Sequence, residues 1–417
     1  MSVNNRILYS CQIVTIAESG HGHIANEPQP VHGVQSVGMT TSFNLEQAFE
    51  LGQIEIYENI EGTPDVEVTL EKVLDGYPLI YLMASTGVVG SSASGLLARS
   101  KERCDVSLGI FGEEFNNIAS ATFNSGGAEV EVRCTGMYIS SVSYSIPTDG
   151  NITESVTLVG NDKRWLTGAA VNITNQTATL FDGLDDPMAL AAGDTAFGAS
   201  GGIQRREDVL VQYAILPESI YGVTKSALGA LPTYGNAWDA GEKAPKVHLQ
   251  SINVSTDFSR DDVLELGRKT PYYRPANFPV EVSCEIEAIS TSGDFVEAAE
   301  VGDVDLFATA SSGNNTQEEV IWIPIRCGVT LDLGRKNRLS SVSYGGGDAT
   351  GGNVSNTYSY TNFNDFDVKQ LGHNNQAVMG TGNAALPGDL DAAWLSDVQL
   401  TNYAANNDRL KGTGVPY

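Results

Sequence analysis

The chain lacks long apolar runs and has few of the residues on which catalytic and metal sites depend. Its 417 residues include only 5 His, 5 Cys and 4 Trp, against 44 Gly. The longest apolar candidate, residues 78–84, is far shorter than the roughly 20 residues that cross a bilayer. The N-terminus has no apolar signal-peptide core. These absences predict a soluble chain that is made in a cytoplasm and has no membrane partner.

The cysteines do not form a pattern that holds a fold together. They are odd in number and widely spaced, and no two form a CxxC pair, which argues against a disulfide framework and against a zinc site. We expect buried, reduced thiols at these positions, namely Cys11, Cys104, Cys134, Cys284 and Cys327.

Catalytic and metal-binding motifs are absent as well. The sequence has no P-loop, no GxGxxG after a strand, no HExxH and no GxSxG. Two clusters come nearest to a metal site, but the histidines lack a Cys or carboxylate at ligand spacing, and the aspartates lack the 1-3-5 spacing of a calcium loop. These clusters are His21, His23 and His32, and Asp182, Asp185 and Asp186. With 51 acidic residues some carboxylates pair inevitably, so we predict no catalytic, metal or cofactor site.

The charge balance is strongly acidic. There are 51 acidic and 24 basic residues, a formal net charge of −27. Such a chain repels phosphates, so specific nucleic-acid binding is not expected. The charge has two interpretations: simple solubility, or an acidic channel wall that lets DNA slide past without holding it.

Alternation of apolar and polar residues predicts a mainly β protein. Residues 66–71 and 280–287 place apolar side chains on one face and acids with Ser or Thr on the other. Residues 45–51 instead suggest a short helix or a turn, which Gly52 would end, and residues 261–266 before Gly267 look equivalent.

An internal repeat organises the chain. Residues 34–64 match residues 249–279 without a gap, with nine of 31 positions identical. Residues 66–68 answer 280–282, 133–134 answer 326–327, and the Ser-Ser-Val-Ser-Tyr of 140–144 recurs at 340–344. Preserved order predicts a duplicated domain. We expect a first domain at 1–165, a connecting arm at 166–207, a second domain at 208–370 and a C-terminal extension at 371–417 with one short helix near 390–400.

The first copy resembles bacteriophage tail tube proteins, also called major tail proteins. The resemblance rests on residues 33–38, 43–47, 55–62, 140–144 and 149–163. It covers most of the first copy and extends more weakly to the second, where prolines and a Gly-rich stretch replace parts of the pattern. The family has no catalytic residues to transfer, so the resemblance implies that the chain is not an enzyme.

The resemblance implies two tandem β-sandwich domains, each with a short flanking helix. In the family six such domains form a ring whose inner strands make one barrel. Rings stack around a tape measure protein, and DNA later passes through an electronegative lumen without specific binding. A duplicated chain favours three chains per pseudo-hexameric ring. Six chains, with the second domain outside the ring, remain the alternative.

The sequence therefore predicts a structural tail-tube subunit of a virion, assembled in a host cytoplasm with itself, a tape measure protein and other tail proteins. The polar faces of the matched strands suggest lumen-lining residues, namely Glu67, Glu71, Glu281 and Glu285. Three alternatives stay open: a distal-tail or baseplate ring protein, a carbohydrate-binding β-sandwich, and a decoration or fibre protein. The missing signal peptide and the 4 Trp weigh against the carbohydrate-binding protein.

Overall fold

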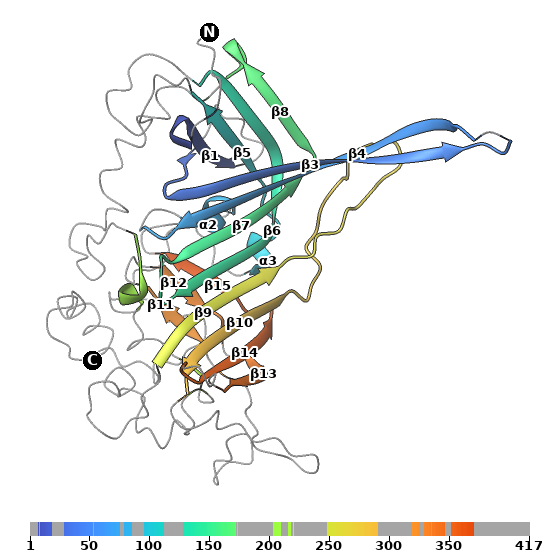
Figure 1. Cartoon of the computed structure of the whole chain (residues 1–417). Coiled ribbons are helices and arrows are strands. Elements are labelled where there is room, and N and C mark those ends of the chain that lie inside the picture. The colour runs from blue at the N-terminus through green and yellow to red at the C-terminus, as the bar shows by residue number, and fades with distance from the viewer. Residues whose placement is uncertain are drawn as a thin grey trace, which may run out of the picture.

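The computed structural model shows a mainly β protein, as the alternation predicts (Figure 1). It describes residues 7, 9–18, 29–52, 54–75, 79–85, 96–111, 128–171, 173, 203–209, 216–217, 220, 248–290, 319, 321–325, 329–334, 336–346 and 352–370. The strands of the first part are β1 Gln12–Glu18, β2 Gln29–Pro30, β3 Val34–Phe49, β4 Ile56–Val73, β5 Cys104–Ile110, β6 Val130–Pro147, β7 Thr153–Gly160 and β8 Asp162–Thr167. The later strands are β9 His248–Asp257, β10 Glu281–Ile289, β11 Trp322–Pro324, β12 Val329–Asp332, β13 Arg338–Gly345, β14 Ser355–Phe363 and β15 Asp367–Gln370.

One long antiparallel run of strands crosses the molecule. It has the order β3-β4-β7-β6-β9-β10-β14-β13, and we call it the front sheet. The first part of β6 also pairs with β5 and β8, and β5 continues to β1 and β2, which completes a 12-stranded sheet. A separate 3-stranded sheet, β11-β12-β15, lies behind the lower strands in Figure 1. The short helices α2 Ile80–Met83 and α3 Leu96–Arg99 lie behind the front sheet.

The core fills the space on one side of the front sheet. Every second residue of its central strands is buried, because side chains alternate across a strand. Each Val, Leu or Ile buried in this way contributes about 1.5–3 kcal/mol relative to exposure. The core residues include Val68, Leu70, Val142, Tyr144, Ile252, Val254, Val282, Ile286, Tyr358 and Tyr360.

The strand order of the first half of the front sheet recurs in the second. The run β3-β4-β7-β6 is followed by β9-β10-β14-β13, with antiparallel pairing throughout. Bulges fall at matching places. Gln35 is the extra residue between β3 and β4, and Gln250 is the extra residue between β9 and β10. Ser140 and Ser340 are the extra residues of β6 and β13. Both are pairs that the sequence repeat aligns.

The helix alternative beside Gly52 and Gly267 is wrong, whereas the chain does turn at residues 51–52 and 266–267. Residues 45–49 belong to β3, where cross-strand pairing with β4 outweighs the helix-forming residues Leu45, Glu46 and Gln47. Residues 261–266 form a loop in which Val263 bridges to Tyr273. The two glycines have φ of +97° and +89°, a left-handed conformation that glycine adopts without strain at a tight turn.

Four of the five cysteines are buried, as the sequence predicts. Cys11, Cys104, Cys134 and Cys284 are buried, and none of these four forms a disulfide. Burial raises the pKa of Cys134 to about 11 and of Cys284 to about 12, so these thiols stay protonated. Cys327 lies outside the described residues, as do His21, His23, the aspartates at 182, 185 and 186, and the C-terminal extension. No helix in the described ranges is long and apolar enough to span a membrane.

Candidate functional surfaces

The outer face of the front sheet is lined by hydroxyl and acidic side chains. One cross-strand row joins Glu71 on β4 to Ser155, Ser143, Ser255, Ser283 and Thr361 on successive strands. The next row on β6, β9, β10, β14 and β13 contains Ser145, Asn253, Glu285, Ser359 and Ser341. Among the described residues of this polar face, Arg338 at the start of β13 is the one Arg, and there is no Lys.

The predicted lumen residues all lie on this polar face. Glu67, Glu281 and Glu285 are exposed, and Glu71 is partly exposed. They come from β4 and β10, which hold the same place in the repeated strand order. The face therefore carries most of its acids on β4 and β10, and Asp257 at the end of β9 lies between them.

Strand pairing changes which glutamates correspond. Continuing the sequence match of residues 66–68 with 280–282 aligns Glu71 with Glu285. The strand register instead matches Glu71 with Glu287, because Glu71 lies opposite Ser36 and Glu287 lies opposite Ser251, which the repeat aligns with Ser36. Both serines donate to their glutamates, at 3.2 Å and 3.3 Å respectively. Glu287 is thus a polar-face acid that the predicted set of lumen residues left out. The continued alternation of Glu281, Glu285 and Glu287 was the signal that could have found it.

A long hairpin carries apolar side chains out of the body of the fold. The ends of β3 and β4 project to the right in Figure 1 and form an arm that turns at Gly52. Its exposed apolar residues are Phe43, Leu45, Phe49, Leu51, Ile54, Ile56, Tyr57 and Ile60. An apolar surface of this kind is typical of a protein–protein contact.

The loop that joins β9 to β10 follows the base of this arm. It spans residues 258–280, and we call it the second loop; its tip at Leu266 and Gly267 matches Leu51 and Gly52 of the arm. It exposes Leu264, Leu266 and Tyr272. The sequence repeat aligns the arm with this loop, but only the arm forms a regular hairpin.

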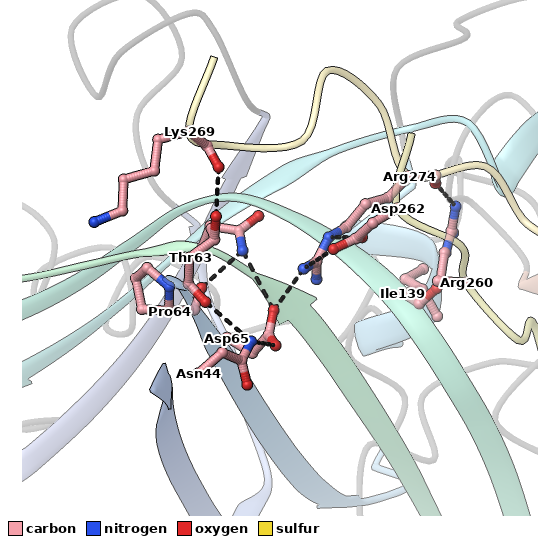
Figure 2. Close-up of polar contacts among 10 residues, drawn as sticks. Asn44, Thr63, Pro64, Asp65, Ile139, Arg260, Asp262, Lys269 and Arg274 are labelled. Carbon is pink, nitrogen blue, oxygen red and sulfur yellow. Dashed lines mark hydrogen bonds and ion pairs between the residues drawn. The ribbon is translucent and has the colours of Figure 1, made fainter. Parts of the chain in front are cut away.

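A polar clamp fastens the second loop to the arm (Figure 2). Arg274, itself buried, bridges Asp65 of β4 at 2.7 Å and Asp262 of the loop at 2.6 Å. Asn44 of β3 donates to the second carboxylate oxygen of Asp65 at 2.9 Å. The Thr63 hydroxyl donates to the Lys269 carbonyl oxygen. Two segments about 200 residues apart in sequence therefore hold each other in a fixed geometry.

A second arginine fixes the start of the loop against β6. Arg260 donates to the Ile139 carbonyl at 2.8 Å and to the Arg274 carbonyl at 2.9 Å. Its guanidinium lies 5.0 Å from the ring centroid of Tyr138 and 5.5 Å from that of Phe258. Burial lowers the pKa of Arg260 to about 10, and it remains charged at neutral pH.

Buried polar groups inside the fold serve its architecture. The Glu154 carboxylate accepts hydrogen bonds from the Ile80 and Tyr81 amides, at 2.7 Å and 3.1 Å, and from the Tyr144 hydroxyl at 2.8 Å. Burial raises the pKa of Glu154, and these three donors oppose the shift. The carboxylate is fully buried, so it joins α2 to β6 and β7 and is closed to a substrate.

His32, the one described member of the histidine cluster, lies beside a buried ion pair. Lys72 donates to the His32 carbonyl at 2.6 Å and pairs with Asp75 at 2.7 Å. Burial, aided by the Lys72 charge, lowers the pKa of His32 to about 4. The described residues contain no group of three or more His, Cys, Asp or Glu that could hold a metal ion.

Comparisons with known proteins give structural neighbours but no sequence relative. No family model matches the chain, and no curated protein matches it. The anti-feeding prophage tube-terminating cap aligns with 40% of this chain and 95% of its own, at 13% identity and a TM-score of 0.27. The sheath–tube complex of an extracellular contractile injection system aligns with 40% of this chain and 95% of its own, at 12% identity and 0.27. Hcp1 from Flavobacterium johnsoniae aligns with 36% of this chain and 98% of its own, at 14% identity and 0.18.

Proposed function

We propose that this chain is a structural subunit of a phage-type tail tube, built from two tandem tube domains at 1–165 and 208–370. One observation carries the proposal: the strand order of the front sheet repeats, and the two runs join edge to edge through β6 and β9. A sheet that adds an equivalent unit to itself within one chain has the geometry needed to add further units from other chains. Repeated addition closes into a ring or continues as a filament.

The proposed ring contains three chains and has the polar face on the inside. Its Ser and Thr rows with acidic stripes would line the bore, and its apolar face is already covered by the core. Six chains per ring, with the second domain outside, is the alternative arrangement. An acidic, hydroxyl-lined wall repels DNA phosphates and offers them no cationic row to bind, so DNA would slide through.

The apolar arm supplies the contact between stacked rings in this proposal. It extends beyond the body of the fold with its tip exposed (Figure 1), and the Arg274 clamp lies at its base. Burying the exposed aromatic and aliphatic side chains between Leu45 and Ile60 against the next ring would stabilise the stack through the hydrophobic effect.

The proposed partners are further copies of the chain, a tape measure protein inside the bore, and other tail proteins at its ends. The proposed location is the virion tail, after assembly in the host cytoplasm. The proposal includes no catalytic step. A distal-tail or baseplate ring is the second candidate, because such rings would use the same edge-to-edge addition. A tube subunit is abundant in the particle, whereas a baseplate ring is present in few copies.

Negative-stain electron microscopy of the purified full-length chain tests the proposal. We expect hollow rings that stack into tubes as the protein concentration rises. Solid particles or a monomer at every concentration would contradict it. Single rings that never stack would favour the distal-tail alternative.

A further inference from the structure

We propose that β13 of one chain pairs with β3 of a second copy of this chain, antiparallel and in the register that β6 has with β9. The inference rests on the proposed tube function and identifies the strands and residues that join neighbouring chains. It comes from the junction inside the chain, which serves as a template for the junction between chains.

The two proposed edges correspond to the two strands that meet inside the chain. In the repeated order, β13 holds the place of β6, and β3 holds the place of β9. The strands β6 and β9 pair with each other from Ser141–Asp257 to Pro147–Ser251. Among the described strands, β13 pairs with β14 alone and β3 with β4 alone, so each offers an edge to another chain.

Apolar side chains that are buried at the β6–β9 junction have exposed counterparts on β13 and β3, as expected if those two strands lack their partners. Tyr144 on β6 is 1% exposed, whereas Tyr344 at the same place on β13 is 56% exposed. Phe258, which follows β9, is fully buried, whereas its aligned partner Phe43 on β3 is 69% exposed. Each open edge thus exposes the apolar residue that the internal junction covers.

The same contrast extends along β3. Ile252 and Val254 of β9 are 3% and 1% exposed, and they lie in the main core. Their counterparts Val37 and Met39 of β3 are only partly buried. A neighbouring strand on the free side of β3 would cover them as β6 covers β9.

The repeat offsets transfer the register to the proposed interface. β6 matches β13 residue by residue from Ser140 and Ser340, and β3 matches β9 from Gln35 and Gln250. The internal pairs Val142–Thr256, Ser143–Ser255 and Tyr144–Val254 therefore become intermolecular pairs. These are Val342–Thr41, Ser343–Thr40 and Tyr344–Met39.

A loop contact at the end of the junction transfers in the same way. The Phe258 amide donates to the Ser140 carbonyl of β6 at 2.8 Å, and the Phe258 side chain is fully buried. The counterpart is an intermolecular bond from the Phe43 amide to the Ser340 carbonyl, with Phe43 buried beneath β13. The interface joins two different edges, so it is head-to-tail and leaves the same free edges at each end until the ring closes.

Engineered cysteines test the register in the full-length chain. Residues directly opposite on antiparallel strands have Cβ atoms about 4.5–5.5 Å apart, whereas diagonal neighbours lie about 7–8 Å apart, beyond the span of a disulfide. Thr40→Cys with Ser343→Cys should form intermolecular disulfides under mild oxidation and give a ladder of covalent multimers. The control Ser42→Cys with Ser343→Cys, shifted by two residues on the same face, should react about tenfold more slowly or not at all.

Two control proteins show how an absence of intermolecular disulfides is to be interpreted. Ser143→Cys with Ser255→Cys reports the internal junction and should give a disulfide within one chain, with no multimer. The unsubstituted chain reports any background from its native cysteines. Microscopy and sedimentation of each reduced sample show whether rings still form.

The outcomes separate this inference from the tube proposal. A ladder that forms fastest with Thr40→Cys and Ser343→Cys supports both. Hollow rings that give no ladder, or that cross-link equally well in the shifted pair, overturn the register and leave the tube proposal standing. A chain that stays monomeric at all concentrations overturns both.

Discussion

At the scale of single residues, the polar face depends on where each glutamate lies in the sheet. Alternation alone placed Glu67, Glu71, Glu281 and Glu285 on one face of their strands, and strand pairing agrees with that placement. Their role in lining a bore stays a prediction. Comparing the two copies by sequence did not match Glu71 with Glu287. Such a comparison does not reveal a β-bulge or a two-residue difference in strand register.

Reversing charge on the polar face tests its role. Changing Glu67, Glu71, Glu281 and Glu285 to Lys should slow DNA release from assembled particles on the order of tenfold, because a cationic wall holds phosphates. Ring assembly should persist, since these side chains point away from the core. Glu207→Lys makes the charge change of one such substitution at an exposed site off the sheet, and it is the control for each of the four Glu→Lys changes made singly. Release at the normal rate from assembled Glu→Lys particles would rule out this wall.

His32 makes stability depend on pH in the acidic range. Its pKa is lowered from 6.5 to about 4, so the unfolded chain takes up the proton first. Its contribution to stability is present above pH 6.5 and is lost as the pH falls towards 4. The group is partly solvated, so solvent screening reduces the loss to about 1 kcal/mol.

His32→Gln should remove this part of the acid sensitivity. Urea unfolding at pH 7.5 and pH 5 measures it, as the difference between the variant and the unsubstituted chain. Glu154 works in the opposite direction, since its raised pKa favours the fold as the pH falls, and it cancels in that comparison. An identical pH dependence in both chains would show that His32 carries none of it.

At the scale of elements, the arm and the second loop show how tertiary contacts override local preference. Helix-forming residues at the end of β3 became strand because β4 pairs with them along the whole arm. In the second copy, prolines at 271 and 275 remove amide donors, and the chain forms a loop instead of a hairpin. The sequence showed the turn residues Gly52 and Gly267 but not the structure around them.

The clamp between these elements is a target for mutation. Arg274→Ala should lower the free energy of unfolding by about 1–2 kcal/mol, because it removes a buried guanidinium from two carboxylates that remain partly solvated. Thermal unfolding measures the loss, and limited proteolysis should cut the second loop faster. Arg268→Ala, which removes an exposed ion pair with Glu265, should change stability by less than about 0.5 kcal/mol. Equal effects of the two substitutions would exclude a clamp at Arg274.

At the scale of the whole molecule, the sequence predicted the β class and the order of the matched blocks. Only the family resemblance implied that the inner strands of both domains would belong to one barrel, and the residues themselves did not show which strands would join the two runs. The join depends on β6 pairing with β9 across about 110 residues of sequence, and no local pattern encodes such a contact. Most of the proposed connecting arm at 166–207 lies outside the described residues, so the domain boundaries stay predictions.

The mass of an isolated ring tests the central claim most directly. If each chain supplies two equivalent units of one closed sheet, native mass measurement should give a ring of three chains around an open bore. A six-chain ring would mean that only one unit per chain enters the wall. A single chain that never closes with others would contradict the account as a whole.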